Sequence, residues 1–262
     1  MPLITTNVDA RGVATLTLNR ADKHNALDGA TVQELHAALT ALGADAQVRV
    51  VVVTGAGASF CAGADIAHMR SMMGATEQQN VDDALLLARC LRTLDELDKP
   101  VIARVNGNVY GGGVGLVACA DIAIAVETAK FALTEVRLGI VPAVISPYVV
   151  AAIGNRHARR LFLTATPFDA PEARSIGLLH FTATAEQLDA TVESQVDQLL
   201  RGGPEALRAA KKLVRRMAQL GDREALALET ARLLAQLRVG PEGREGLSAF
   251  LERRKPGWHG EK

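Results

Sequence analysis

Two glycine-rich turns and one glutamate are the residues of this chain whose types and spacing suggest chemistry. The first turn spans residues 59–66 and reads SFCAGADI, and the second spans residues 106–113 and reads NGNVYGGG. Each follows a β-branched apolar run, and its small side chains let backbone N–H groups approach a ligand closely. If the N–H groups of Ala64 and Gly112 converge on one oxygen, they stabilise the negative charge that develops when a carbonyl becomes an enolate.

Glu135 is the candidate general acid/base. It stands in the segment TEVRLG, residues 134–139, with apolar residues on both sides. Desolvation by such neighbours raises the pKa of a carboxyl group toward a value useful for proton transfer, whereas a surface carboxylate would gain no such shift. We therefore predict one catalytic site in which Glu135 transfers protons and the backbone N–H groups of Ala64 and Gly112 stabilise the negative charge on the substrate oxygen.

Repeated strand, turn and helix patterns must position these groups. The runs at residues 13–18, 50–54 and 101–105 predict strands, and Asp28 is placed as the N-cap of a following helix. Residues 81–97 carry a helical apolar stripe that ends at Lys99-Pro100, while residues 68–80 have no firm period and indicate a mobile lid or a short helix. The alternation predicts an α/β fold.

From about residue 185 the pattern becomes wholly helical. Pro204 is a first-turn proline, and further helices are expected near Asp222 and Pro241. We predict a core over residues 1–195 and a C-terminal helical region over residues 196–262. The apolar stripes of these helices must be buried on the core or on another subunit.

Composition excludes several classes of partner. The 262 residues are 48% hydrophobic, and Lys+Arg and Asp+Glu balance at 29 each, so no global field recruits nucleic acid or an anionic membrane. The N-terminus lacks a secretory pattern and no apolar run approaches ~20 residues, so we expect a cytoplasmic protein. Cys61, Cys90 and Cys119 are too scattered for a disulfide framework or a zinc site and are expected in the core.

The two turns resemble those of the enoyl-CoA hydratase/isomerase (crotonase) family, as do residues 18–27, LNRADKHNAL, and residues 250–256 near the C-terminus. The resemblance covers nearly the whole chain. It implies the crotonase spiral of ββα units with C-terminal helices that form a homotrimer or homohexamer. It also implies an acyl-CoA thioester as substrate, with coenzyme A as part of that substrate and with no metal or redox cofactor.

Gly115 departs from the pattern of the family's usual hydratases, which carry one glutamate there and a second at the position of Glu135. One carboxylate suffices for the family's isomerases, so isomerisation is a serious alternative. Residues 134–147, however, resemble bacterial hydratases of branched or carboxylated enoyl-CoAs such as 3-methylglutaconyl-CoA. We therefore predict hydration of a 2-enoyl-CoA, with Gly115 leaving room for a β-methyl group or a second water.

The resemblance also implies a set of substrate-binding positions. Lys23 and Lys255, the latter in the basic cluster 253–255, are candidates for the CoA phosphates, because cations suit phosphate oxygens. The other predicted positions are Ala26, Ala62, Ile66 and Gly115. Arg70, Arg104 and Arg137 are unranked candidates for a distal carboxylate.

Other interpretations of the sequence are weaker. Asp65 and Asp121 are expected to be structural, and neither His68 nor Cys61 has a motif that supplies a partner for nucleophilic catalysis. A dinucleotide fingerprint fails because Leu116 stands where its third glycine should be. Two alternative functions remain possible. The protein could bind acyl-CoA without catalysis, or it could bind RNA through the basic residues of segment 208–216.

Overall fold

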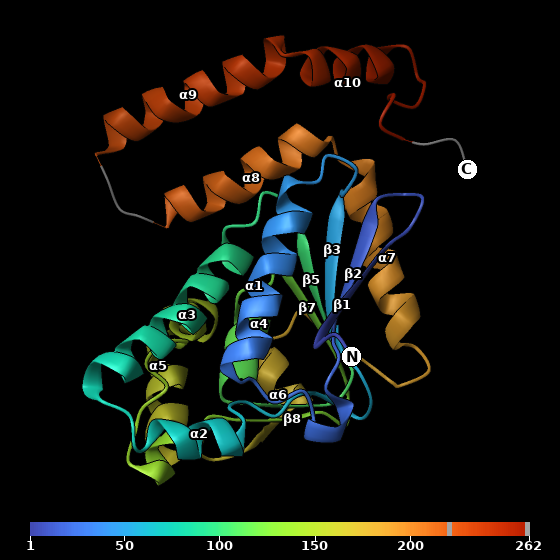
Figure 1. Ribbon diagram of the computed structural model, residues 1–262. Helices are drawn as coiled ribbons and strands as arrows, with labels where there is room; N and C mark the ends of the chain where they lie inside the picture. The colour runs from blue at the N-terminus through green and yellow to red at the C-terminus, as the bar shows by residue number, and fades with distance from the viewer. Residues whose placement is uncertain (219–221, 260–262) are drawn as a thin grey trace.

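A six-stranded sheet forms the centre of the fold (Figure 1). The computed structural model describes residues 1–218 and 222–259. The strand order is β1 (Ile4–Val8), β2 (Val13–Leu18), β3 (Val50–Gly55), β5 (Val101–Val105), β7 (Ile122–Val126) and β10 (Phe181–Ala183). Strand β1 is antiparallel to β2, and every other pair is parallel. The predicted strands are confirmed, and their β-branched runs suit a sheet that is covered on both faces.

Helices cover both faces of this sheet (Figure 1). Helix α1 (Gly29–Ala44) and helix α3 (Glu77–Asp95) pack together on one side, and α7 (Leu188–Arg201) packs on β3, β5 and β7 from the other. Asp28 caps α1 as predicted, because its side chain accepts a hydrogen bond from the N–H of Thr31 at 2.8 Å.

A second, smaller sheet lies at one end of the first. Its order is β4 (Ser59–Cys61), β6 (Asn108–Tyr110), β8 (Lys130–Ala132) and β9 (Phe168–Asp169), with β4, β6 and β8 parallel. Strands β3, β5 and β7 of the large sheet lead through short connections into β4, β6 and β8. The chain therefore repeats a strand, strand and helix unit, and the predicted crotonase-like spiral is confirmed.

The small sheet corrects the sequence interpretation of the two turns. Residues 59–61 and 108–110 belong to strands β4 and β6, so only the later part of each predicted turn is a turn. Helix α2 (Ile66–Met72) follows β4, and α4 (Gly112–Ala118) follows β6. The stretch 68–80 contains the later part of α2 and the start of α3, so its short-helix interpretation holds.

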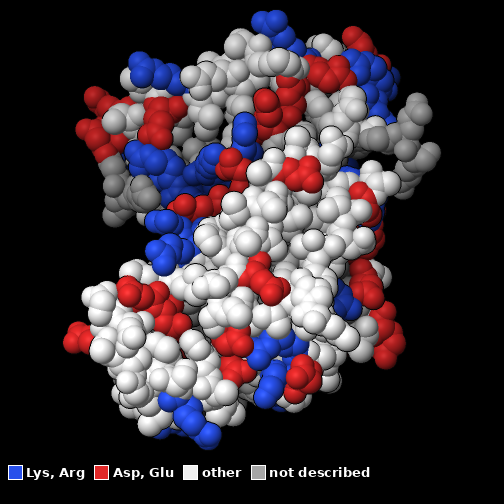
Figure 2. Space-filling model, in the orientation of Figure 1, with Lys and Arg blue, Asp and Glu red and all other residues white. Residues whose placement is uncertain are grey.

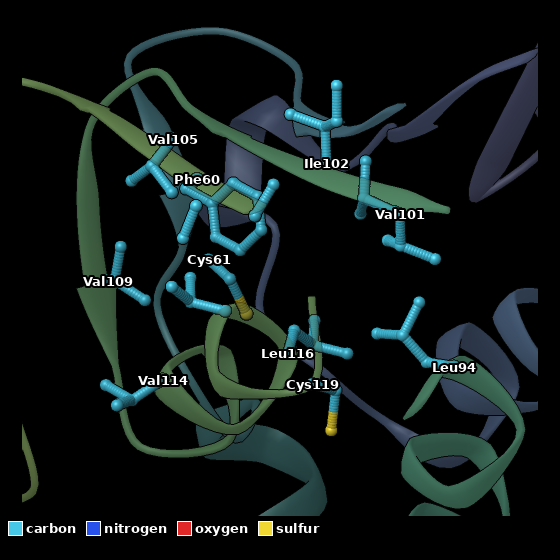
Figure 3. Close-up of a cluster of buried hydrophobic side chains, with 14 of the residues drawn as sticks. Phe60, Cys61, Leu94, Val101, Ile102, Val105, Val109, Val114, Leu116 and Cys119 are labelled. Carbon is cyan, nitrogen blue, oxygen red and sulfur yellow. The ribbon is translucent and has the colours of Figure 1, made fainter. Parts of the chain in front are cut away.

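Packing behind the turns holds α4 against the small sheet (Figure 3). Phe60 and Cys61 of β4 share one apolar cluster with Val109 of β6 and with Val114 and Leu116 of α4. A Cβ at Gly113 would lie 2.8 Å from the Cβ of Cys61, so a larger residue there would push the helix away. Cys61, Cys90 and Cys119 are all buried, as predicted.

The second half of the chain is largely helical. Glu135 opens a short 3₁₀ helix, η2 (Glu135–Leu138), which is followed by α5 (Ser146–Thr164), α6 (Ala170–Ser175) and α7. The C-terminal helices are α8 (Pro204–Met217), α9 (Arg223–Val239) and α10 (Pro241–Leu251). As predicted, Pro204 starts α8 and a helix begins next to Asp222, whose side chain caps α9.

The predicted boundary between residues 195 and 196 lies inside α7, and Val196 is buried in the same core as the sheet. The division into two domains stays a prediction. Residues 219–221 and 260–262 of the predicted C-terminal region lie outside the part of the chain that the structure describes. No described helix is both long and apolar enough to cross a membrane.

Candidate active site

The three predicted catalytic groups follow three neighbouring parallel strands. Ala64 comes after β4, Gly112 after β6 and Glu135 after β8. Because the carboxyl ends of parallel neighbours lie at one edge of a sheet, residues far apart in sequence meet there. All three line one cavity of about 320 Å³.

The two glycine turns approach each other through Gly63 and Gly111. Both have positive φ, +84° and +49°, a conformation that glycine adopts without strain. A Cβ at Gly63 would lie 2.9 Å from the carbonyl oxygen of Tyr110, and one at Gly111 would lie 3.2 Å from Glu135 Oε1. Glycine at these positions therefore lets both turns and the glutamate gather around one point.

The backbone N–H groups of Ala64 and Gly112 are available to a ligand. Leu27 donates its N–H to the carbonyl of Gly63 at 2.7 Å and accepts from the N–H of Asp65 at 2.8 Å, which leaves the N–H of Ala64 outside this pairing. Gly112 is the first residue of α4, where an N–H has no acceptor within its own helix. Within residues 1–218 and 222–259, neither N–H has a hydrogen-bond acceptor.

Glu135 supplies a half-buried carboxylate to this cavity. Burial raises its pKa above the ordinary 4.5, in the predicted direction, although a hydrogen bond with its own backbone offsets part of this effect. Oε2 is buried and has no hydrogen-bond partner within the described part of the chain. A buried acceptor without a partner is costly, so this oxygen is suited to hold a water or a substrate proton.

Arg20 holds the first turn in place. Its guanidinium donates to Asp65 Oδ2 at 3.0 Å and to the carbonyl of Ala26 at 2.6 Å, and it lies 3.1 Å from Asp28 Oδ2. Asp65 also caps α2 by accepting from the N–H groups of Ala67 and His68. Asp65 is therefore structural, as predicted, whereas the sequence interpretation missed Arg20 although it lies in the segment that resembles the family.

The space expected beside Gly115 does not exist. A Cβ at this position would lie 2.9 Å from the Cβ of Ile145 and closer still to Cγ2 of the same side chain. Ile145 lines the cavity, whereas Gly115 is buried behind it. The expectation of room for a β-methyl group or a second water at Gly115 is therefore wrong, because an aliphatic side chain from the segment before α5 fills that volume.

The predicted substrate-binding residues fall into two groups. Ala62 donates its N–H to the carbonyl of His24 at 2.9 Å, which places the segment of Lys23 and Ala26 beside the first turn. Lys23 and Ile66 are exposed near this turn. Lys255 follows α10, which lies at the opposite end of the molecule from α2 (Figure 1), so the fold does not bring Lys255 to the site of its own chain.

No Lys or Arg lines the cavity in the part of the chain that the structure describes. Arg70 and Arg137 are exposed, and Arg104 is directed to Asp189 of α7 at 2.7 Å. The lining residues are Leu27, Asp28, Gly29, Val32, Ala64, His68, Asp83, Ala84, Leu86, Leu87, Gly112, Glu135, Val141, Pro142, Ala143, Val144 and Ile145.

His68 and Asp83 form a pair in this wall. Their Nε2 and Oδ1 atoms are 2.9 Å apart, and the pair joins α2 to α3. Asp83 has no motif around it, so only its contact with His68 identifies it. By contrast, Asp121 accepts from the backbone of Val101 and from Lys211, which confirms its structural role.

Four of the five basic residues of α8 in segment 208–216 form ion pairs within the described part of the chain, whereas Arg208 is exposed and forms none there. Lys211 pairs with Asp121, Lys212 with Asp98, Arg215 with Asp95 and Glu96, and Arg216 with Glu229. Figure 2 shows blue and red side chains interleaved over this part of the surface. Nucleic-acid binding through α8 is therefore disfavoured, because the phosphates of RNA would have to compete with these carboxylates.

Comparison with known proteins agrees with this architecture. Residues 9–261 match the family model described as enoyl-CoA hydratase/isomerase. The chain belongs to the enoyl-CoA hydratase/isomerase family. Among curated members, crotonyl-CoA hydratase of Syntrophomonas wolfei is 35% identical over 245 residues, which cover 93% of either chain.

Solved structures of the family superpose closely. A putative enoyl-CoA hydratase/isomerase (crotonase) from Legionella pneumophila is 41% identical with a TM-score of 0.92, and the match covers 98% of both chains. Pseudomonas aeruginosa AtuE is 39% identical with a TM-score of 0.95, over 99% of this chain and 100% of that one. The enoyl-CoA hydratase/isomerase fold is thus present over nearly the whole length of the chain.

Proposed function

We propose that this protein catalyses the reversible addition of water across the double bond of a 2-enoyl-CoA thioester. The observation that carries the proposal is the meeting of one half-buried carboxylate, Glu135, with two unpaired backbone N–H groups, those of Ala64 and Gly112, in a single cavity. An oxyanion hole beside a proton carrier suits chemistry that passes through an enolate.

In the proposed reaction, Glu135 holds a water molecule and accepts one of its protons as the water oxygen bonds to Cβ. The electrons of the double bond move toward the thioester oxygen, whose negative charge is stabilised by the N–H groups of Ala64 and Gly112. The enolate then collapses as Glu135 returns the proton to Cα, so the carboxylate ends as it began. The reaction is redox-neutral and is proposed to need no cofactor besides the CoA of the substrate.

The acyl group is proposed to be short and branched. Residues 134–147 support a branched or carboxylated substrate of the 3-methylglutaconyl type through their resemblance to such hydratases. The lining supports an uncharged acyl group, because it contains the carboxyl groups of Asp28, Asp83 and Glu135, and His68 already faces Asp83. A distal carboxylate would meet repulsion there.

The test is to follow loss of the conjugated enoyl-thioester absorbance and to identify the products by mass. Crotonyl-CoA, 3-methylcrotonyl-CoA and 3-methylglutaconyl-CoA are the substrates to compare. A gain of one water supports the proposal. An unchanged mass with a moved double bond would assign the protein as an isomerase, which the single carboxylate beside Gly111 also permits. Binding without turnover would indicate a non-catalytic acyl-CoA-binding protein.

The C-terminal helices support a proposed homotrimer or homohexamer. Within the described residues α9 has no buried side chain, and Leu234, Val239, Phe250 and Leu251 of α9 and α10 are each more than half exposed. Exposed apolar side chains of this kind mark an interaction surface. Light scattering on the purified protein tests the subunit number, and a monomer would contradict the proposal. The cytoplasmic location stays a prediction.

A further inference from the structure

His68 and Asp83 are the ionisable pair of the cavity that the proposed reaction does not use. Asp28, the remaining carboxylate of the wall, is already committed, because it caps α1 and pairs with Arg20. The side chains of His68 and Asp83 are 24% and 35% exposed, so both are partly withdrawn from water. Their contact connects the part of the cavity wall formed by α2, which carries His68, to the part formed by α3, which carries Asp83.

A second hollow of about 490 Å³ lies behind this wall. Gly29, Asp83 and Leu86 line both the hollow and the acyl cavity, so the two volumes share a partition. The further lining residues of the hollow are Gln33, Ser71, Met72, Ala75, Gln79 and Asp82. Its lining mixes aliphatic groups with polar ones, and Gln33, Ser71, Gln79 and Asp82 are exposed, so the hollow is an open groove beside the acyl cavity.

The imidazole of His68 lies beside this partition, on the side of the acyl cavity. A Cβ at Gly29 would lie 3.8 Å from His68 Cε1, so the ring lies against α1 while its Nε2 contacts Asp83 on α3. The ring therefore spans the gap between two helices that carry the partition. Asp65 fixes the backbone of His68 by accepting its N–H at 3.2 Å, which keeps the ring near this position.

We propose that the His68–Asp83 bridge determines acyl-chain length by closing the acyl cavity against the second hollow. This inference rests on the proposed function. In the native protein a short acyl group ends at the bridge, and a longer chain must displace the imidazole from its carboxylate. Removing the ring joins the two volumes, so the extra methylenes of a long chain gain a place to bind.

The experiment compares kcat/KM for crotonyl-CoA and 2-decenoyl-CoA in the native protein and in His68→Ala and Asp83→Ala. We expect the ratio of decenoyl to crotonyl activity to rise about tenfold in both variants. Asp83→Asn keeps the size and an acceptor for the imidazole, so it should retain the native ratio. Asp82→Ala is the matched control, because Asp82 is the preceding residue of α3 and lines only the hollow.

An unchanged ratio in both His68→Ala and Asp83→Ala would overturn the inference, as would an equal rise in Asp82→Ala. Dissociation constants for butyryl-CoA and decanoyl-CoA, measured by calorimetry on the same proteins, give a second readout that needs no turnover. If the native protein hydrates neither substrate, the proposed function fails. The ratio of the dissociation constants for butyryl-CoA and decanoyl-CoA still decides the role of the bridge. Thermal unfolding shows whether each variant is folded, and if one alanine variant does not fold, the ratio measured in the other alanine variant decides the inference.

Discussion

Ile145 occupies the volume that a side chain at Gly115 would need, with 2.9 Å between its Cβ and the position of a Cβ on Gly115. Gly115 and Ile145, which lie on different elements, thus determine together whether position 115 can supply a second carboxylate beside Glu135. A glutamate at position 115 would require Ile145 to move, so Glu135 is left as the carboxylate beside the glycine turns.

Gly115→Glu should therefore destabilise the protein rather than add a second catalytic carboxylate. Overpacking of this kind costs about 1–3 kcal/mol, and the buried charge adds to that cost. Gly115→Glu combined with Ile145→Gly should recover part of the lost stability. Chemical denaturation of the two variants measures this recovery, and a stable single variant with faster hydration would contradict the packing argument.

Glu135→Gln should lower kcat by ~10²-fold or more while acyl-CoA affinity stays near the native value, because the amide keeps the size of the side chain and loses proton exchange. Steady-state kinetics and calorimetry provide the two measurements. Glu127→Gln is a suitable control, since Glu127 is exposed and outside the cavity. Activity within a few-fold of native would rule out Glu135 as the acid/base.

The raised pKa of Glu135 predicts a stability effect with a definite sign. Burial raises this pKa above 4.5, so the charged carboxylate destabilises the folded state once the pH rises through that value. Glu135→Gln should therefore melt at a higher temperature than the native protein at neutral pH. The difference should vanish below pH 4.5, where both side chains are neutral. Calorimetric scans across this range test the sign, and equal melting temperatures at neutral pH would contradict it.

Arg20→Met should lower kcat by ~10-fold or more. Asp65 and the carbonyl of Ala26 lose their shared donor, so the first turn, which carries Ala64, is held less firmly. Arg20 acts only through this turn, so Arg20→Lys should restore part of kcat by pairing with one carboxylate. Arg11→Met offers a matched control, since Arg11 is exposed and pairs with Asp9 and Glu193 away from the cavity. An undiminished kcat in Arg20→Met would leave Arg20 with a purely structural role.

Ala64→Pro removes the N–H that we assign to the oxyanion hole. The N–H has no acceptor within the described residues, so its loss should cost ~10²–10³-fold in kcat without breaking an internal hydrogen bond. The variant must match the native protein in melting temperature and oligomeric size for this comparison. Hydration at the native rate by such a folded variant would place the thioester oxygen elsewhere.

The groups that we propose as catalytic were predictable because their residue types carry a local signal. Glycines after β-branched runs indicate backbone that can approach a ligand, and a glutamate among apolar residues indicates a raised pKa. The positions of Ala64, Gly112 and Glu135 in one cavity follow from the order of these segments in a strand, strand and helix repeat.

The features of the fold and of the site that could not be predicted depend on contacts that leave no pattern in the local sequence. Strands β4 and β6 have three residues each, too few for a periodic signal, so the sequence pattern does not distinguish them from the turns. The Ile145 side chain fills the space beside Gly115, and the His68 side chain contacts that of Asp83; in both cases the two residues belong to different elements. Such contacts are determined by packing in three dimensions, which composition and periodicity do not encode.

The small sheet also has a consequence for folding. Ala64, Gly112 and Glu135 meet only when β4, β6 and β8 have paired, and these strands are separated by long stretches of chain that contain α2, α3 and β7. Long-range parallel pairing is slow because the intervening chain must be ordered first. During refolding, helical signal should therefore return before catalytic competence, and recovery of turnover reports the moment at which the small sheet closes.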